Sequence, residues 1–218
     1  MSSVYTLKHS RFSSHMRLLG LLRTERWGAR LLDVGCGNGY VSSLLVGQGF
    51  DVTGVEHPAG FDANFPQNVK LITHNLEQPL PDLGGVYNVI VLADVLEHLP
   101  RPQELLESLK KFLAPGGVIV CSLPNSGNLY FRLNVLFGRF PEDEKGLFDR
   151  THLHFWMLAN WQGLFDRAGY SLQIEEVTPI PFTLIHETLG WLESVWYHLA
   201  RVWKTLLAYQ FLVVARPK

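Results

Sequence analysis

The chain has few cysteines, little net charge and no long apolar run, and each scarcity excludes a class of protein. Its 218 residues include two cysteines, Cys36 and Cys121, which fit reduced thiols better than a disulfide framework. No cysteine or histidine spacing resembles a zinc motif, so we expect no metal site. No apolar run approaches the roughly 18 residues of a membrane span, and no secretory signal is visible. We therefore expect a cytoplasmic protein.

The charge balance is close to zero and argues against a nucleic-acid partner. Lysine and arginine together number 19 and the acidic residues 20, which gives a formal net charge of -1. Proteins that bind nucleic acid generally carry a positive field. The hydrophobic fraction of 47% excludes disorder over most of the chain and supplies one sizeable core. We expect residues 1–218 to form a single domain.

Apolar spacing along the chain predicts strands and helices in alternation. Strands are expected over 31–34, 51–55, 69–73, 86–92, 118–123, 170–178 and 208–215. Helices are expected over 9–26, 40–47, 102–113, 156–168 and 182–206. The continuous apolar run 89–92 is typical of a parallel strand that is buried on both faces. The alternation favours an α/β fold in which helices cover both faces of a mostly parallel sheet.

A glycine-rich turn joins the strand 31–34 to the helix 40–47. Residues 31–39 read Leu-Leu-Asp-Val-Gly-Cys-Gly-Asn-Gly, and glycine lets a ligand approach the backbone because it has no Cβ. A dinucleotide-binding turn would have its third glycine at position 40, which is Tyr40. Asp33, just before the turn, would repel a phosphate and attract a cationic ligand. The turn therefore indicates a ligand without a pyrophosphate.

Glu56 adds a second element of a nucleoside site. It ends the second strand, 21 residues after Gly35, where an acidic side chain can accept both hydroxyls of a ribose. The competing interpretation is an acidic residue at a solvent-exposed strand end.

Together with two later stretches, the turn resembles the motifs of class I S-adenosylmethionine-dependent methyltransferases. Residues 87–99 read Tyr-Asn-Val-Ile-Val-Leu-Ala-Asp-Val-Leu-Glu-His-Leu and are similar to the family's fourth-strand motif. Residues 113–117, Leu-Ala-Pro-Gly-Gly, resemble the turn before its fifth strand. Residues 123–125 and 149–155 are similar to a bacterial subgroup that includes relatives of quinone-biosynthesis methyltransferases. The resemblance implies a Rossmann-like, doubly wound sheet of seven mostly parallel strands, the last of them antiparallel.

The resemblance also implies S-adenosylmethionine as the cofactor. Its methionine end would lie at the glycine turn, its ribose at Glu56, and its reacting methyl near Asp94. Asn75 stands where the family usually has an acid that faces the adenine amino group. The residues expected to contact the cofactor are Asp33, Gly35, Cys36, Gly37, Gly39, Glu56, His57, Asn75, Leu76, Ala93 and Asp94.

Histidines are the candidates for a catalytic base. If the acceptor is a hydroxyl, a histidine can remove its proton, and His152 and His154 lie in a loop expected to cover the site, with His98 behind them. The alternative is a packing role, because Phe148, Phe155 and other aromatic residues surround them in the sequence.

The two halves of the chain are expected to bind different molecules, the cofactor and the acceptor. After a helical arm at 1–30, residues 31–123 would hold the cofactor. Residues 124–218 would form the acceptor side, covered by a helical insertion at 125–148 and by the helix 182–206. The tryptophans of that helix fit packing on the sheet, an acceptor pocket, a contact between copies of the chain, or a peripheral membrane contact.

These observations predict methyl transfer from S-adenosylmethionine to a small or lipid-like acceptor, mainly at oxygen. Two alternatives remain open. One is a non-catalytic protein that binds S-adenosylmethionine or acts as a scaffold. The other is a nicotinamide-dependent oxidoreductase, which Tyr40 and Asp33 disfavour.

Overall fold

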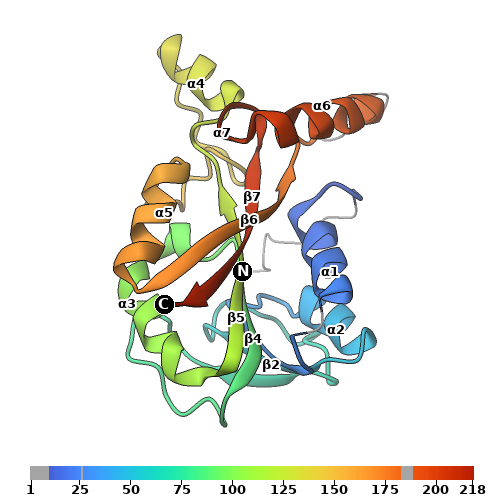
Figure 1. Ribbon diagram of the computed structural model, residues 1–218, viewed down its shortest axis with the longest axis vertical. Coiled ribbons are helices and arrows are strands. Elements are labelled where there is room, and N and C mark those ends of the chain that lie inside the picture. Colours follow the sequence, from blue (N-terminus) through green and yellow to red (C-terminus); the bar gives the residue numbers. More distant parts are fainter. Residues whose placement is uncertain (1–9, 26, 183–188) are drawn as a thin grey trace.

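The computed structural model describes residues 10–25, 27–182 and 189–218, and a seven-stranded sheet forms its centre (Figure 1). The strand order is β3-β2-β1-β4-β5-β7-β6. Neighbours among β1 to β5 pair in parallel, whereas β7 runs antiparallel to both β5 and β6. The strands are β1 (Arg30–Val34), β2 (Asp51–Glu56), β3 (Lys70–Thr73), β4 (Tyr87–Ala93), β5 (Leu113–Pro124), β6 (Tyr170–Thr178) and β7 (Gln210–Pro217). The expected mostly parallel, doubly wound sheet is confirmed.

Helices cover both faces of this sheet (Figure 1). They are α1 (Ser14–Thr24), α2 (Tyr40–Gly47), α3 (Pro102–Leu109), α4 (Leu129–Leu136), α5 (Leu158–Arg167), α6 (Gly190–Val202) and α7 (Lys204–Leu207), with single 3-10 turns at η1 (Leu96–His98) and η2 (Lys110–Phe112). In the described ranges, no helix is long and apolar enough to cross a membrane.

Two apolar clusters separate the faces, because successive strand side chains point to opposite sides of a sheet. On β4, Val89 and Val91 join the cluster that contains the apolar residues of α1 and α2. Ile90 and Leu92 join the larger cluster that contains those of α3 and α5. All four side chains are fully buried. The continuous apolar run therefore forms a strand with a core on each side.

Several boundaries differ from the sequence predictions. The helix expected over 102–113 is α helix only as far as Leu109, and β5 begins at Leu113 rather than at 118. The glycines before 118 thus lie inside β5, at an irregularity in its pairing with β4. In the insertion at 125–148, one helix forms, α4. The helix expected over 182–206 is α6 and α7, interrupted at Trp203, and its residues 183–188 lie outside the described ranges.

A pair of leucine substitutions tests the core. Leu106 on α3 is fully buried in the larger cluster, whereas Leu44 on α2 is 41% exposed. Leu106→Ala should lower the free energy of unfolding by about 2 to 5 kcal/mol, because it leaves a cavity. Leu44→Ala should cost less than about 1 kcal/mol. Urea denaturation measures both, and equal losses would contradict the assignment of the core.

Candidate functional site

The glycine turn connects β1 to α2 at the carboxyl end of β1. Gly35, Gly37 and Gly39 have φ values of 73°, 54° and 71°, a region that residues with a Cβ rarely adopt. A Cβ on Gly35 would lie 2.6 Å from a methyl of Val95, and one on Gly39 would lie 2.8 Å from the ring of Phe65. A Cβ on Gly37 would meet nothing within 4 Å. Gly37 is therefore the glycine whose bare backbone faces space that a ligand can fill.

Glu56 joins the end of β2 to this turn. Its Oε2 accepts a hydrogen bond of 2.6 Å from the Gly37 amide, and its Oε1 accepts one of 2.7 Å from the His57 amide. A carboxylate offers about four lone-pair positions, so two amides leave capacity for hydroxyl donors. His57 is exposed, and its Nδ1 accepts from the Ala59 amide at 3.1 Å. Glu56 thus stands beside Gly37, where the ribose contact was predicted.

Asp33 lies beneath the turn rather than on its surface. Its side chain is 2% exposed and accepts a 2.5 Å hydrogen bond from the Ser42 hydroxyl on α2. Burial raises the pKa of Asp33 to about 6, although the Ser42 bond acts in the opposite direction. Burial and the nearby Asp33 and Glu56 carboxylates raise the pKa of the Cys36 thiol, which makes it a poor nucleophile. Asp33 therefore fixes the turn, and its direct contact with a cofactor stays a prediction.

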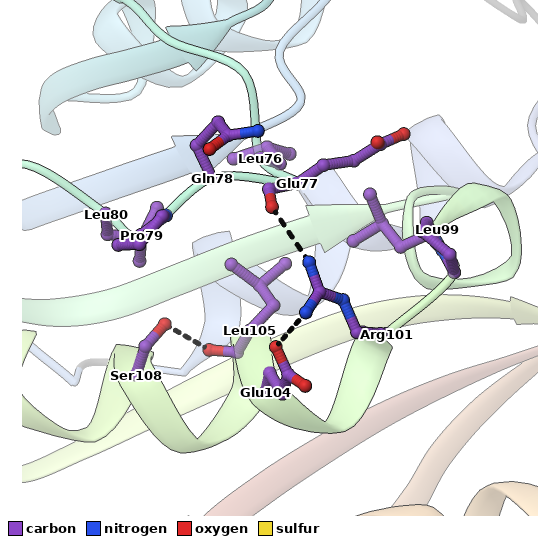
Figure 2. A pocket seen from close by; sticks show the side chains of 11 residues that line it. Leu76, Glu77, Gln78, Pro79, Leu80, Leu99, Arg101, Glu104, Leu105 and Ser108 are labelled. Atoms are coloured by element: carbon purple, nitrogen blue, oxygen red, sulfur yellow. Dashed lines mark hydrogen bonds and ion pairs between the residues drawn. The ribbon is translucent and has the colours of Figure 1, made fainter.

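Asn75 and Leu76 follow β3 at the same edge of the sheet. The Asn75 Oδ1 accepts from the Glu77 amide at 3.0 Å, which closes a tight turn. Leu76 lines a pocket of about 270 Å³ (Figure 2), together with Glu77, Gln78, Pro79, Leu80, Leu99, Pro100, Arg101, Glu104, Leu105 and Ser108. Arg101 donates to the Glu77 carbonyl at 3.4 Å and pairs with Glu104 at 3.3 Å. Of the residues predicted to contact the cofactor, Leu76 alone lines this pocket, so the adenine contact stays a prediction.

Asp94 occupies a strained position just after β4. Its φ of 56° is unusual for a residue with a side chain. The Asp94 Oδ1 accepts hydrogen bonds from the Ser122 hydroxyl on β5 and, at 2.7 Å, from the Gln210 amide on β7. Side chains of β5 and β7 therefore hold this carboxylate in place at the end of β4. Such strain commonly marks functional sites, and Ala93, the last residue of β4, is half-buried beside it.

His98 and His152 come together in the structure although they are 54 positions apart in the sequence. Their ring centroids lie 4.7 Å apart, and His152 Nε2 lies 3.9 Å from an oxygen of the buried Glu97. His98 Nδ1 lies 3.1 Å from the Thr151 hydroxyl. Ligand atoms of Glu97, His98 and His152 all lie within 4.8 Å of one another. The sequence predicted no metal site, yet this nitrogen and oxygen set has the chemistry to hold a divalent cation.

Burial controls the protonation of His152. Desolvation and, secondarily, the neighbouring His98 lower the pKa of His152 to about 4, while Asp149 and Asp94 oppose the shift. The ring is therefore neutral near pH 7, the form that accepts a proton or binds a metal. The influence of Asp94 also indicates that the cluster of Glu97, His98 and His152 lies near the end of β4.

His154 lies outside this cluster. Its Nε2 is 2.8 Å from the Leu99 carbonyl, and its ring stacks on Trp156 with the centroids 4.2 Å apart. These contacts favour the packing interpretation over the catalytic one. The sequence analysis assigned no role in the site to Glu97, Ser122 or Gln210. A polar residue within an apolar strand was the available signal for Ser122.

The protonation of His152 makes stability depend on pH. Because its pKa falls from the ordinary 6.5 to about 4 in the folded chain, the unfolded chain binds the extra proton in this window. Stability from this group is therefore complete above about pH 6.5 and is lost as the pH falls toward 4. Between pH 7 and 4.5, the wild-type protein should lose about 1 to 2 kcal/mol more than His152→Asn. The exposed His198→Asn is the control, and identical slopes for all three proteins in urea titrations would contradict the shift.

Comparisons with known proteins identify the family to which the chain belongs. A family model described as "Methyltransferase domain" matches residues 7–174. A ubiquinone biosynthesis O-methyltransferase of Caulobacter sp. (strain K31) is 35% identical over 117 residues, which cover 47% of this chain and 44% of that protein. The enzyme of the same name from Psychrobacter arcticus is 32% identical over 114 residues, 45% and 42% of the two chains. The match thus spans less than half the length of these relatives.

Solved structures share the fold over nearly the whole chain. A SAM-dependent methyltransferase from Archaeoglobus fulgidus has a TM-score of 0.63 at 20% identity and covers 96% of this chain and 97% of its own. Magnesium protoporphyrin IX methyltransferase from Synechocystis PCC 6803, with bound SAH, has a TM-score of 0.64 at 16% identity, covering 98% and 90%. Family match, motifs and sheet order agree, and the chain therefore belongs to the methyltransferase-domain family, within the class I S-adenosylmethionine-dependent methyltransferases.

Proposed function

We propose that this chain transfers the methyl group of S-adenosylmethionine to an oxygen atom of a small acceptor molecule. The observation that carries the proposal is the bare backbone of Gly37, open to space and hydrogen-bonded to the Glu56 carboxylate. The relatives named as ubiquinone biosynthesis O-methyltransferases support oxygen as the atom methylated.

The residues present fit the cofactor. The positive charge of its sulfonium suits a turn that has the Asp33 carboxylate beneath it and the Glu56 carboxylate beside it. Glu56 would accept the ribose hydroxyls, and Asn75 and Leu76 would border the adenine. Gly37 would let the chain pass close to the methionine end, with Ala93 and Asp94 opposite, while Gly35 and Gly39 permit the positive φ values of the turn. His57 and Cys36 are the remaining residues of the predicted cofactor set. Their backbone atoms, next to Glu56 and Gly37, would contact the cofactor.

Bound S-adenosylmethionine supplies an electrophilic methyl group that an oxygen nucleophile can attack in line. The chain's own task is to align the acceptor, exclude water and take up the hydroxyl proton. Neutral His152 and its neighbour His98 are the groups that we assign to the proton, with Glu97 as their positioning residue. Asp94, held by Ser122 and Gln210, would orient the acceptor beside them.

A packed aromatic cluster near the proposed base supports an acceptor with an apolar or aromatic body. Phe131, Phe148 and Phe155 pack together, and Phe131 and Phe148 stack with centroids 4.5 Å apart. The ring centroids of His152 and Phe155 lie 6.0 Å apart, so this aromatic cluster adjoins the proposed base. Hydroxylated aromatic molecules therefore form the acceptor class to examine first.

Two valine substitutions test the cofactor site and the activity. Gly37→Val fills the ligand space, and Gly116→Val introduces the same strain at a glycine that also has a positive φ and open surroundings. Both should cost about 1 to 2 kcal/mol of stability. Only Gly37→Val should weaken S-adenosylmethionine binding in calorimetry, by more than about tenfold, because the valine occupies the ligand's place.

Turnover is measured as S-adenosylhomocysteine released with hydroxylated aromatic acceptors. Wild type and Gly116→Val should release it, and Gly37→Val should not. Equal cofactor affinity in the two variants would place the ligand elsewhere. Tight binding without turnover on any acceptor would instead identify a non-catalytic binding protein.

The titration of Asp33 predicts a pH dependence of cofactor affinity. Its pKa of about 6 in the free chain means that the carboxylate, the form that attracts a cation, is lost as the pH falls through 6. Affinity for S-adenosylmethionine should fall by up to about tenfold between pH 7.5 and 5. Ser42→Ala removes the hydrogen bond that lowers the pKa and should move the midpoint upward. A profile in Asp33→Asn that follows the wild type would assign the titration to another group.

A further inference from the structure

Helix α4 buries little of its surface. It has eight residues, and one of them, Phe131, is buried. Isolated helices shorter than about 12 to 15 residues are marginal in water, and most helices in proteins are stabilised by packing an apolar face. Figure 1 shows α4 at one end of the molecule, beyond the end of the sheet. The chain itself therefore supplies little of the packing that such a short helix needs.

Three exposed apolar side chains lie on one face at the end of α4. Leu136 and Phe137 follow Leu133 by three and four positions, and the exposed fractions of the three side chains are 74%, 73% and 42%. Phe140, which follows the helix, is 52% exposed. We call these four residues the α4 surface. Apolar patches of this kind commonly mark contact with a partner.

The charges beside the α4 surface have both signs. Residues 129–145 hold three basic and three acidic side chains, and all six are exposed: Arg132, Arg139, Lys145, Glu142, Asp143 and Glu144. The basic residues at 132 and 139 come first, and the three consecutive acids follow them. A partner surface of one sign, such as an anionic membrane, would be attracted by half of these charges and repelled by the other half.

A second copy of the same segment fits this pattern. Two copies related by a two-fold axis present the same surface to each other in opposite directions. The basic residues 132 and 139 of each copy can then lie near the acids 142–144 of the other, while the apolar residues meet at the axis. A surface that holds both signs is thus complementary to itself.

Helix α6 is a weaker candidate for such a contact. Trp191 and Val202 are 65% and 88% exposed on it, but its one exposed side chain with a permanent charge is Arg201. Its acidic residue, Glu193, is buried and accepts a hydrogen bond from the Ser10 hydroxyl. Two copies of that face would bring like charges together, so the charges favour α4.

We propose that two copies of this chain associate through the α4 surface about a two-fold axis. Each copy would supply the apolar contact that α4 lacks within its own chain, and charges of opposite sign would pair around that contact. The inference goes beyond methyl transfer and does not depend on it.

Sedimentation velocity of the full chain between about 1 and 100 μM tests the proposal. The wild type should form a dimer as its concentration rises. Leu136→Ser with Phe137→Ser should raise the dissociation constant at least about tenfold, because a few apolar side chains at the centre of an interface carry most of its affinity. A monomer over the whole range overturns the proposal, and so does a variant that dimerises as the wild type does.

A matched pair of leucines provides the control. Leu133 on α4 and Leu44 on α2 are 42% and 41% exposed, and both lie on helices of eight residues. Leu133→Ser should weaken the dimer, whereas Leu44→Ser should leave its dissociation constant unchanged. Leu199→Ser with Val202→Ser makes the same test on α6, and loss of the dimer in that variant alone would overturn the proposal.

Charge reversal tests the two-fold arrangement outside the helix itself. Glu142→Lys with Glu144→Lys makes the segment mainly basic, and Arg139→Glu with Lys145→Glu makes it mainly acidic. Each variant alone should dissociate at least about tenfold more readily at low salt, because like charges then meet. An equimolar mixture of the two variants should form a mixed dimer, and its absence would contradict the pairing of opposite charges.

Two further measurements distinguish the other outcomes. Flotation of a monomeric chain with vesicles of phosphatidylcholine and phosphatidylglycerol would assign the α4 surface to lipid and overturn the proposal. Calorimetry with S-adenosylmethionine verifies that every variant is folded. A dimer that does not bind the cofactor would overturn the proposed function and support the association.

Discussion

The hydrogen bond from the Gly37 amide to the Glu56 carboxylate holds the ends of β1 and β2 together at the point where a ligand meets the backbone. A charged acceptor makes this bond stronger than an ordinary backbone bond. Asp33 supports the same turn from below through Ser42 on α2. The turn is thus fixed on two sides before any ligand arrives, which reduces the entropy that binding must remove.

The proposed chemistry depends on a second place where side chains from several strands meet. The parallel strands end at one edge of the sheet, and the antiparallel β7 begins there, so Asp94, Ser122 and Gln210 meet from three strands. The Glu97, His98 and His152 cluster adjoins them. Asp94 and the histidine pair to which we assign the proton therefore lie near the predicted methyl position. Asp94 follows β4 and His98 ends η1, whereas His152 lies in the irregular segment between α4 and α5.

The sequence predicted the bounds of those helices and strands that local residue patterns determine. The helix 40–47 and the strand 170–178 have the bounds that glycine and apolar spacing indicated. It did not predict that His152 would contact His98 and Glu97 while His154 packed on Trp156, because neighbours in sequence diverge according to tertiary packing. Ser122 and Gln210 were missed for the same reason, since their meeting with Asp94 depends on strand order. The break at Trp203 follows no glycine or proline, so no local signal announced it.

The place of β7 between β5 and β6 has a consequence for biosynthesis. The ribosome synthesises β6 before β7, the strand that lies between β5 and β6 in the folded sheet. Until Gln210–Pro217 have been translated, both β5 and β6 keep an open edge, and open edges invite pairing with other chains. A nascent chain that lacks this segment therefore exposes two unpaired strand edges. Chaperones would be needed most until β7 has been synthesised.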